Sequence, residues 1–134
     1  MSDLERAREF FAKDRYATEA TGIIIEQVGE CYSKCSLRLD SRHRNAVGSV
    51  MGGVMFTLAD FVFAVATNFE RPSITVTLVS QISYLNAVKG EVLYGESRLI
   101  KDGKTNCFYE IDITDDLGTA VATVSVTGAH INKK

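Results

Sequence analysis

One carboxylate lies in the middle of an otherwise apolar segment. Asp60 is the only charged residue between Arg44 and Glu70, and its neighbours are small or hydrophobic. An ionised carboxylate in an apolar environment is unfavourable by several kcal/mol unless water or polar partners satisfy it. The functional interpretation is a general base or nucleophile whose pKa is set by partial burial. The structural alternative is a cap or an ion pair with a basic residue across an interface.

Two glycines stand upstream of this carboxylate. Met51-Gly52-Gly53 marks the point where a polar loop enters the apolar segment. In a helix beginning there, the first backbone N–H groups have no internal acceptor and carry the positive end of the helix dipole. Such donors suit a developing negative oxygen. A Gly-Gly pair alone can equally serve close packing against a strand, so only its combination with Asp60 points to catalysis.

The element that must position these groups is the only long helix candidate in the chain, residues 51–68. Its apolar residues occur almost all round the helix, which is typical of a helix enclosed by protein. One narrow stripe is small and polar instead. The stripe consists of Gly53, Thr57, Asp60, Ala64 and Thr67 or Asn68.

Strand-like segments lie on both sides of this helix. They are rich in Val, Ile, Thr and Tyr, are separated by turn residues, and cover residues 22–28, 31–40, 73–84, 91–101, 105–114 and 119–128. A short amphipathic helix is expected at residues 3–15. This order predicts an α+β fold, with a curved antiparallel sheet wrapped around one long central helix and a short N-terminal helix added. Because one sheet covers only part of a helix, we expect the uncovered face to meet a second subunit.

The overall composition narrows the class of protein. With 134 residues, 46% hydrophobic and 24% charged, the chain is expected to form one globular domain over residues 1–134. A net charge of −2 and a pI near 5.7 argue against a nucleic-acid-binding surface. No apolar run approaches the roughly 20 residues of a membrane span, because Asp60 interrupts the best candidate. The N-terminus has no signal-peptide pattern, so we expect a cytoplasmic protein without a membrane partner.

The cysteines and histidines offer no metal-binding spacing. His43 and His130 are far apart, and the three cysteines form no CxxC pair. Cys31 and Cys35 fall on one face of a predicted strand, where we expect both to be buried as small apolar side chains. We therefore expect no metal site.

Two stretches of the chain resemble a known protein family. Asn45-Ala46-Val47-Gly48-Ser49-Val50-Met51-Gly52-Gly53, followed by Leu58-Ala59-Asp60, is similar to the N-x-x-G-x-x-H-G-G…L-A-D signature of the hotdog-fold thioesterases of the phenylacetate-degradation (PaaI-like) type. Residues 75–91, TVTLVSQISYLNAVKGE, resemble the family's central strand and the bend after it. The likeness extends over nearly the whole chain after the first helix.

This resemblance implies hydrolysis of acyl-CoA thioesters, without a metal or redox cofactor, at the interface of a homodimer or homotetramer. Gly52 would offer its backbone N–H to the thioester carbonyl. Asp60 of the opposite subunit would activate water or attack directly. Asn45 would orient the water or the carbonyl, and Thr77 lies close to where the family places a Ser or Thr that positions the water.

The chain departs from the family pattern at position 51, where Met51 replaces the usual histidine. Methionine has no proton to donate, so any polarisation of the carbonyl by this side chain is lost. We expect a reduced rate or a shifted substrate range. A non-catalytic acyl-CoA-binding or sensing protein is the alternative function, whereas enoyl-CoA hydratase chemistry is disfavoured because it needs the histidine. Replacement of the missing histidine by His43 is a minor hypothesis.

Coenzyme A carries phosphates, so its site needs local positive charge. The candidates are Arg42 and Arg44 before Asn45, and Lys101 and Lys104 beside the Asp102-Gly103 turn, with Lys89 at the preceding bend. The alternative is that these side chains are ordinary surface charges. The acyl group is expected to contact Met51, Gly53 and phenylalanines of the long helix. Phe56 is the first candidate there, followed by Phe61 and Phe63, although buried phenylalanines are more often plain core.

Overall fold

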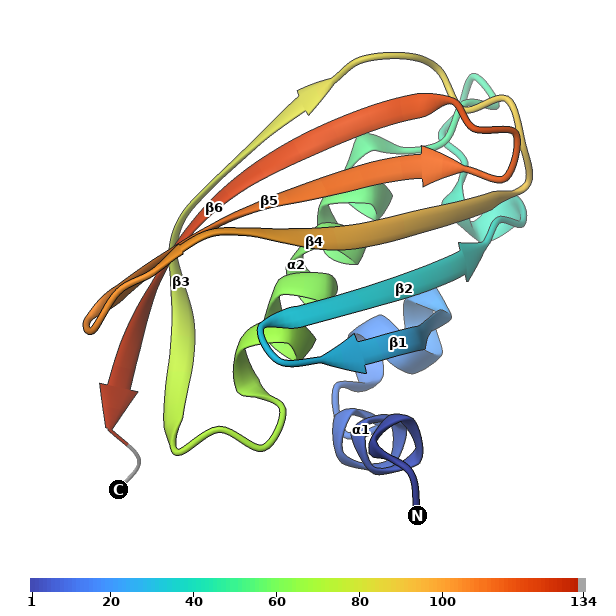
Figure 1. Ribbon diagram of the computed structural model, residues 1–134. Helices are drawn as coiled ribbons and strands as arrows, with labels where there is room; N and C mark the ends of the chain where they lie inside the picture. Colours follow the sequence, from blue (N-terminus) through green and yellow to red (C-terminus); the bar gives the residue numbers. More distant parts are fainter. Residues whose placement is uncertain (133–134) are drawn as a thin grey trace.

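The computed structural model describes residues 1–132 and contains one six-stranded antiparallel sheet, which curves across the molecule (Figure 1). The strand order is β1-β2-β4-β5-β6-β3, so β1 and β3 are the two edges. The strands are β1 Ile23–Gly29, β2 Tyr32–Arg38, β3 Ser73–Tyr84, β4 Val92–Asp102, β5 Asn106–Asp115 and β6 Ala120–Asn132.

The long helix α2, Gly52–Asn68, lies across the concave face of this sheet (Figure 1). Its sheet-facing residues, Leu58, Val62 and Val65, are completely buried. Gly95 of β4 permits the close approach, because a Cβ atom there would lie 2.9 Å from Val62 and 3.1 Å from Leu58. The predicted α+β hotdog arrangement is confirmed. Within residues 1–132, no helix is both long and apolar enough to cross a membrane.

The N-terminal helix is shorter than predicted. Helix α1 covers Asp3–Phe11 and begins with a capping box in which Ser2 and Glu5 bond each other's backbone N–H groups. A turn and a π-helical segment, η1 (Tyr16–Thr21), follow it and end at Gly22, which has a φ of +92°. The prediction of a helix to residue 15 was wrong at its end. Residues 12–15 are Ala, Lys, Asp and Arg, so no large apolar side chain after Phe11 can be buried to extend the helix.

The last strand is longer than predicted, because β6 continues four residues past Gly128 to Asn132 and pairs with β3 from Ala122 to Asn132. Glycine ordinarily weakens a strand and suggested an end there. In the structure Gly128 has a packing role instead, since a Cβ atom would lie 2.7 Å from the ring of Phe63 and 3.0 Å from the sulfur of Cys107. The other strand ends lie within two residues of prediction.

Buried Asp115 fixes the two loops at one end of the sheet, with a residue exposure of 3%. Its Oδ2 accepts hydrogen bonds from the N–H groups of Lys89 (2.9 Å) and Gly90 (3.0 Å), and its Oδ1 accepts from Leu117 (3.0 Å) and Thr119 (2.9 Å). Desolvation works to raise the pKa of Asp115, but these backbone donors hold it well below its usual value. The carboxylate therefore joins the β3–β4 loop to the β5–β6 turn.

Asp115→Ala is expected to lower the free energy of unfolding by about 2–4 kcal/mol, because four partly buried backbone N–H donors lose their acceptor. The matched control is Asp112→Ala, which breaks an exposed 3.5 Å ion pair with Arg98 and should cost less than about 1 kcal/mol. Urea unfolding at pH 7 measures both. Since the folded-state pKa of Asp115 is depressed, its stabilising effect is complete above the unfolded pKa of about 3.9 and declines as the pH falls further. Equal losses in the two variants would contradict this assignment.

Candidate active site

Asp60 lies on the face of α2 that the sheet leaves uncovered. Asp60 and Gly53 are exposed in the single chain, while Thr57 and Ala64 are half-buried. The predicted small and polar stripe is thus real. Of the two residues expected at its end, Thr67 is buried and donates its hydroxyl to the carbonyl of Phe63 (2.7 Å), whereas Asn68 is half-buried.

A cavity of about 330 Å³ opens beside Asp60, between α2 and the segment that precedes η1. Its walls include Thr57, Phe61 and Ala64 of α2 and Asp14 to Ala17 of the N-terminal segment. A second cavity, also about 330 Å³, shares Thr57 and Tyr16 with the first and extends along α2 to Gly53 and Met51. Asp60 therefore faces a recess that runs toward the start of its own helix.

The carboxylate of Asp60 has no neutralising partner in the single chain. Within residues 1–132 it makes no hydrogen bond or ion pair, and the nearby guanidinium of Arg15 is engaged with Glu19 (2.8 Å). Desolvation, and secondarily the negative charge of Asp14, raise the pKa of Asp60. The alternative of an ion pair across an interface stays a prediction, because the structure contains one chain. The arrangement favours a carboxylate able to take up a proton.

The donors expected at the start of α2 are present. Met51 is the N-cap residue, is 57% exposed, and makes no side-chain capping bond. The first N–H with a partner in the helix is that of Val54, which donates to the carbonyl of Met51 (3.0 Å). The described part of the chain supplies no acceptor to the N–H groups of Gly52 and Gly53. They are free to bind an oxygen that carries negative charge.

A further pocket, about 410 Å³ in volume, opens directly at Gly52. Tyr84, the last residue of β3, forms one wall, with its hydroxyl 2.6 Å from the position that a Cβ atom of Gly52 would occupy. Sequence reasoning missed Tyr84. The strand pattern located it at the end of β3, but nothing in the sequence places this strand end beside the start of α2.

Asn45 and Thr77 lie on different elements. The Oδ1 of Asn45 accepts hydrogen bonds from the N–H groups of Val47 and Ser49, both 3.1 Å, so it shapes the loop and leaves Nδ2 to donate. Thr77 lies on edge strand β3, opposite Gly128, in a pair that faces α2. Thr77 is exposed in the single chain. The structure records no direct bond between either residue and Asp60.

His43 does not replace the missing histidine. It is buried (3% exposed), contrary to the expectation for a loop histidine, and both ring nitrogens are engaged. Nε2 lies 2.8 Å from the carbonyl of Thr21, and Nδ1 accepts the N–H of Asp40 (3.0 Å). His43 therefore holds the loop before α2 against η1, and that minor hypothesis is wrong.

One chain does not bring the candidate CoA-binding cations together. Arg42 is paired with Asp40 (3.0 Å), and Arg44 donates to the carbonyl of Gly48 (3.2 Å), both near the start of α2. Lys101 and Lys104 are exposed at the β4–β5 hairpin. That hairpin lies at the opposite end of α2, since Asp102 pairs there with Arg71 (3.3 Å).

The three phenylalanines of α2 have different environments. Phe56 is half-buried and remains available to contact a ligand. Phe61 and Phe63 are each 2% exposed. Phe61 still borders the Asp60 cavity, whereas Phe63 packs edge-on against Tyr109, with ring centroids 5.4 Å apart. Phe63 is therefore core, as the alternative interpretation expected.

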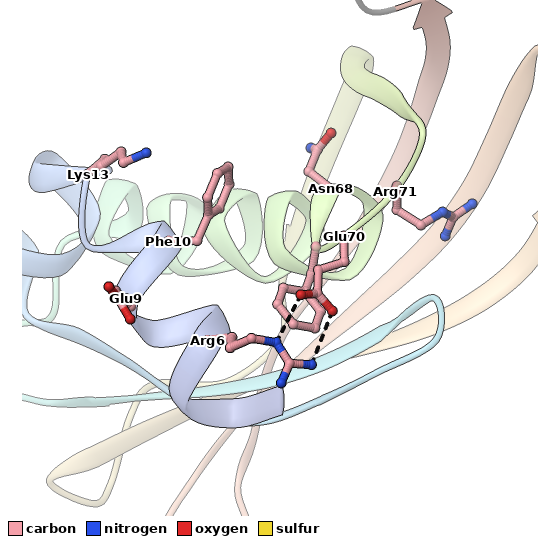
Figure 2. A pocket seen from close by; sticks show the side chains of 8 residues that line it. Arg6, Glu9, Phe10, Lys13, Asn68, Glu70 and Arg71 are labelled. Carbon is pink, nitrogen blue, oxygen red and sulfur yellow. Dashed lines mark hydrogen bonds and ion pairs between the residues drawn. The ribbon is translucent and has the colours of Figure 1, made fainter. Parts of the chain in front are cut away.

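A pocket near the C-terminal end of α2 contains none of the site residues predicted from the sequence. This pocket of about 400 Å³ lies between α1 and this end, lined by Arg6, Glu9, Phe10, Lys13, Asn68, Phe69, Glu70 and Arg71 (Figure 2). The Arg6–Glu70 ion pair (2.9 Å) closes one side of it.

The cysteines differ from one another. All three are free; Cys35 and Cys107 are buried, but Cys31 is half-buried, with its sulfur 3.1 Å from the guanidinium of Arg71. The prediction of plain apolar burial for Cys31 was wrong, because the residue leaves the strand face at the β1–β2 turn with a φ of 55°.

Comparison of the sequence with known proteins identifies the family of this chain. The thioesterase superfamily model matches residues 47–122, more than half of the chain and including both Gly52 and Asp60. A putative esterase of Archaeoglobus fulgidus is 25% identical over 97% of this chain and 84% of its own length. Human acyl-coenzyme A thioesterase 13 is 31% identical over 60% of this chain and 59% of its own length.

Structural comparison supports the same fold. The E. coli PaaI protein from the phenylacetic acid degradation operon superimposes with a TM-score of 0.88, covering 98% of this chain and 96% of that protein. The two sequences are 22% identical, so this likeness concerns the hotdog fold alone.

Asp14→Asn is expected to lower the pKa of Asp60, because it removes a negative charge that disfavours ionisation. The pH titration of the Asp60 side-chain carboxyl, followed by carbon-13 NMR, measures the shift. Asp112→Asn, on the outer face of the sheet, is the control and should leave the titration unchanged. An unaltered or raised pKa of Asp60 in Asp14→Asn would contradict the assigned environment.

Proposed function

Because this chain belongs to the thioesterase superfamily and is a thioester hydrolase with the hotdog fold, we propose that it hydrolyses acyl-CoA thioesters at sites shared by two subunits. The name of the human relative, an acyl-coenzyme A thioesterase, supports the substrate class. The shared site is supported by one observation, the separation of the two catalytic groups along a single helix.

Gly52 and Asp60 are eight residues apart on α2, which corresponds to ~12 Å along the helix axis. The water activated by Asp60 must attack the carbon whose carbonyl oxygen is bound by Gly52, and the water oxygen and this carbon must lie about 3–3.5 Å apart before they react. One straight helix cannot supply both groups to one thioester. A second copy of α2, antiparallel to the first, removes the difficulty.

The midpoint between Gly52 and Asp60 is Phe56. A two-fold axis passing near Phe56 would bring Asp60 of each subunit beside Gly52 of the other, forming two equal sites. The open edge of β3 fits this arrangement, because antiparallel pairing of two β3 strands would continue the sheet across the axis. Ile74, Val76, Leu78 and Val79 of β3 are exposed in the single chain.

In the proposed reaction, the Asp60 carboxylate removes a proton from water as the water oxygen bonds to the thioester carbon. The carbonyl oxygen becomes negative and accepts hydrogen bonds from the Gly52 end of the other subunit's α2. The tetrahedral intermediate then reforms its C=O bond and expels the CoA thiolate, which takes up the proton held by Asp60. This step regenerates the carboxylate and leaves the free acid as the second product. The Nδ2 of Asn45 and the hydroxyl of Thr77 are proposed to orient the carbonyl and the water.

The same two-fold arrangement accounts for the scattered cations. Arg44 lies near the start of α2, and Lys101 and Lys104 lie near its end, so antiparallel helices bring Arg44 of one subunit toward the lysines of the other. Their charges would bind the phosphates of CoA. Met51, Gly53 and Phe56 lie on or beside the uncovered face of α2, where the acyl group would pass.

A non-catalytic acyl-CoA-binding protein is the second candidate, and it rests on Met51 in the place of the family's histidine. Asp60 argues against it. A binding protein has no evident use for a carboxylate with a raised pKa that makes no ion pair within residues 1–132.

Asp60→Asn is expected to lower kcat for acyl-CoA hydrolysis by roughly 10²-fold or more, because the amide keeps the shape but cannot accept the proton. Release of free thiol from a panel of acyl-CoAs measures the rate, with Asp112→Asn as the charge-matched control. Binding of acyl-CoA without turnover in the parent would instead establish the sensing function. Parental rates in Asp60→Asn would exclude the carboxylate as the base.

Lys104→Ala is expected to raise KM for an acyl-CoA about 3- to 10-fold, through loss of one phosphate contact, and to leave kcat nearly unchanged. The acyl thioester of N-acetylcysteamine, which has no phosphates, is the control substrate and should show no change. An equal effect on both thioesters would show that Lys104 does not recognise the nucleotide.

A further inference from the structure

Tyr84 packs on the start of α2. The residue is 53% exposed, and its hydroxyl and ring atoms lie 2.6–3.2 Å from the Cβ position of Gly52. Any side chain at position 52 would displace the phenol ring. Tyr84 pairs with buried Ala122 of β6, so its side chain projects from the sheet face that covers α2. The strand thus directs one hydroxyl to one end of the helix.

The position of the hydroxyl relative to the Gly52 N–H follows from helix geometry. At a helical φ near −60°, the N–H bond and the Cα–Cβ direction of a residue are nearly eclipsed. A group that packs against the Cβ position therefore lies on the same side as the N–H. Both the Tyr84 hydroxyl and the Gly52 N–H border the 410 Å³ pocket at this end of the helix.

We propose that the Tyr84 hydroxyl is a second hydrogen-bond donor to the thioester carbonyl, beside the Gly52 N–H, and supplies the polarisation that Met51 cannot. This inference rests on the proposed hydrolysis and adds a catalytic residue to it. A tyrosine hydroxyl rotates about its C–O bond and can direct its proton to an oxygen in the pocket. Within residues 1–132 it has no other hydrogen-bond partner, so donation to substrate breaks no existing bond.

Both donors are positioned before substrate binds, although different elements position them. The N–H of Gly52 is fixed by the helix, whereas the phenol extends from the end of β3 and packs against the glycine. Each is placed before substrate arrives, which is the condition under which such donors favour the transition state over the ground state. Loss of the hydroxyl should therefore reduce kcat more than it changes KM.

Tyr84→Phe is expected to lower kcat for acyl-CoA hydrolysis by roughly 10- to 10²-fold, with KM changed less than about 3-fold. Tyr94→Phe is the matched control. Tyr94 lies on the outer face of β4, against the Lys34 ammonium (5.2 Å from the ring centroid), and losing its hydroxyl should leave the rate unchanged. Parental kcat in an active Tyr84→Phe variant would overturn the role of Tyr84 alone. A parent protein without turnover would refute acyl-CoA hydrolysis itself, and this role with it.

An infrared measurement separates donation from a structural role. The Asp60→Asn variant is used to hold an acyl-CoA labelled with carbon-13 at the thioester carbonyl, and the C=O stretch of the complex is compared with that of the free thioester. A shift to lower frequency is expected in Asp60→Asn, and part of it should be lost in Asp60→Asn combined with Tyr84→Phe. If kcat falls but the two complexes show the same frequency, Tyr84 does not bond the carbonyl and the proposal is wrong.

Discussion

The packing of α2 into the concave sheet leaves one face of the helix uncovered, and the unpaired charge of Asp60 lies on that face. Burial of Leu58, Val62 and Val65 determines how the helix is rotated, so the Asp60 stripe has to point away from the sheet. The same rotation brings Gly52 beside the end of β3. A helix turned by one residue would bury the carboxylate against the sheet without a partner, which is strongly unfavourable.

Asp60 illustrates how a functional group can work against stability. In this position its ionised form is disfavoured by desolvation and by Asp14, and no ion pair within residues 1–132 compensates. A carboxylate of this kind holds a proton more readily than a solvent-exposed one, which suits proton transfer from water. The buried carboxylate of Asp115 is the opposite case, because backbone donors satisfy both oxygens and its pKa is depressed. Asp115 is almost completely buried and Asp60 is exposed in the single chain, so their opposite pKa shifts follow from the backbone donors that Asp115 has and that Asp60 lacks within residues 1–132.

Local patterns were sufficient to predict α2, the sheet and the stripe, because the spacing of apolar residues reports directly which face of an element is buried. Asp60 stood out for the same reason. Features that depend on distant contacts could not be predicted. Gly128 lies inside β6 because the ring of Phe63 occupies the space that a side chain at this position would need. His43 is buried because it packs against η1. Tyr84 contacts Gly52 because the curved strand β3 ends beside the start of α2. The spacing of eight residues between Gly52 and Asp60 can be read from the sequence. Only the structure shows that both residues lie on one continuous helix, which keeps the two groups apart.

The central claim is that each active site takes its base from one subunit and its oxyanion donors from the other. Gly52→Pro removes the critical N–H at the first helix position, where proline fits the backbone, and it displaces the Tyr84 ring of the same subunit but retains Asp60. Differently tagged Asp60→Asn and Gly52→Pro chains, co-expressed and purified as the heterodimer, would contain one site with both defects and one intact site. The account predicts two inactive homodimers and a heterodimer with about half of the parental kcat. A heterodimer as inactive as both homodimers would contradict a shared site.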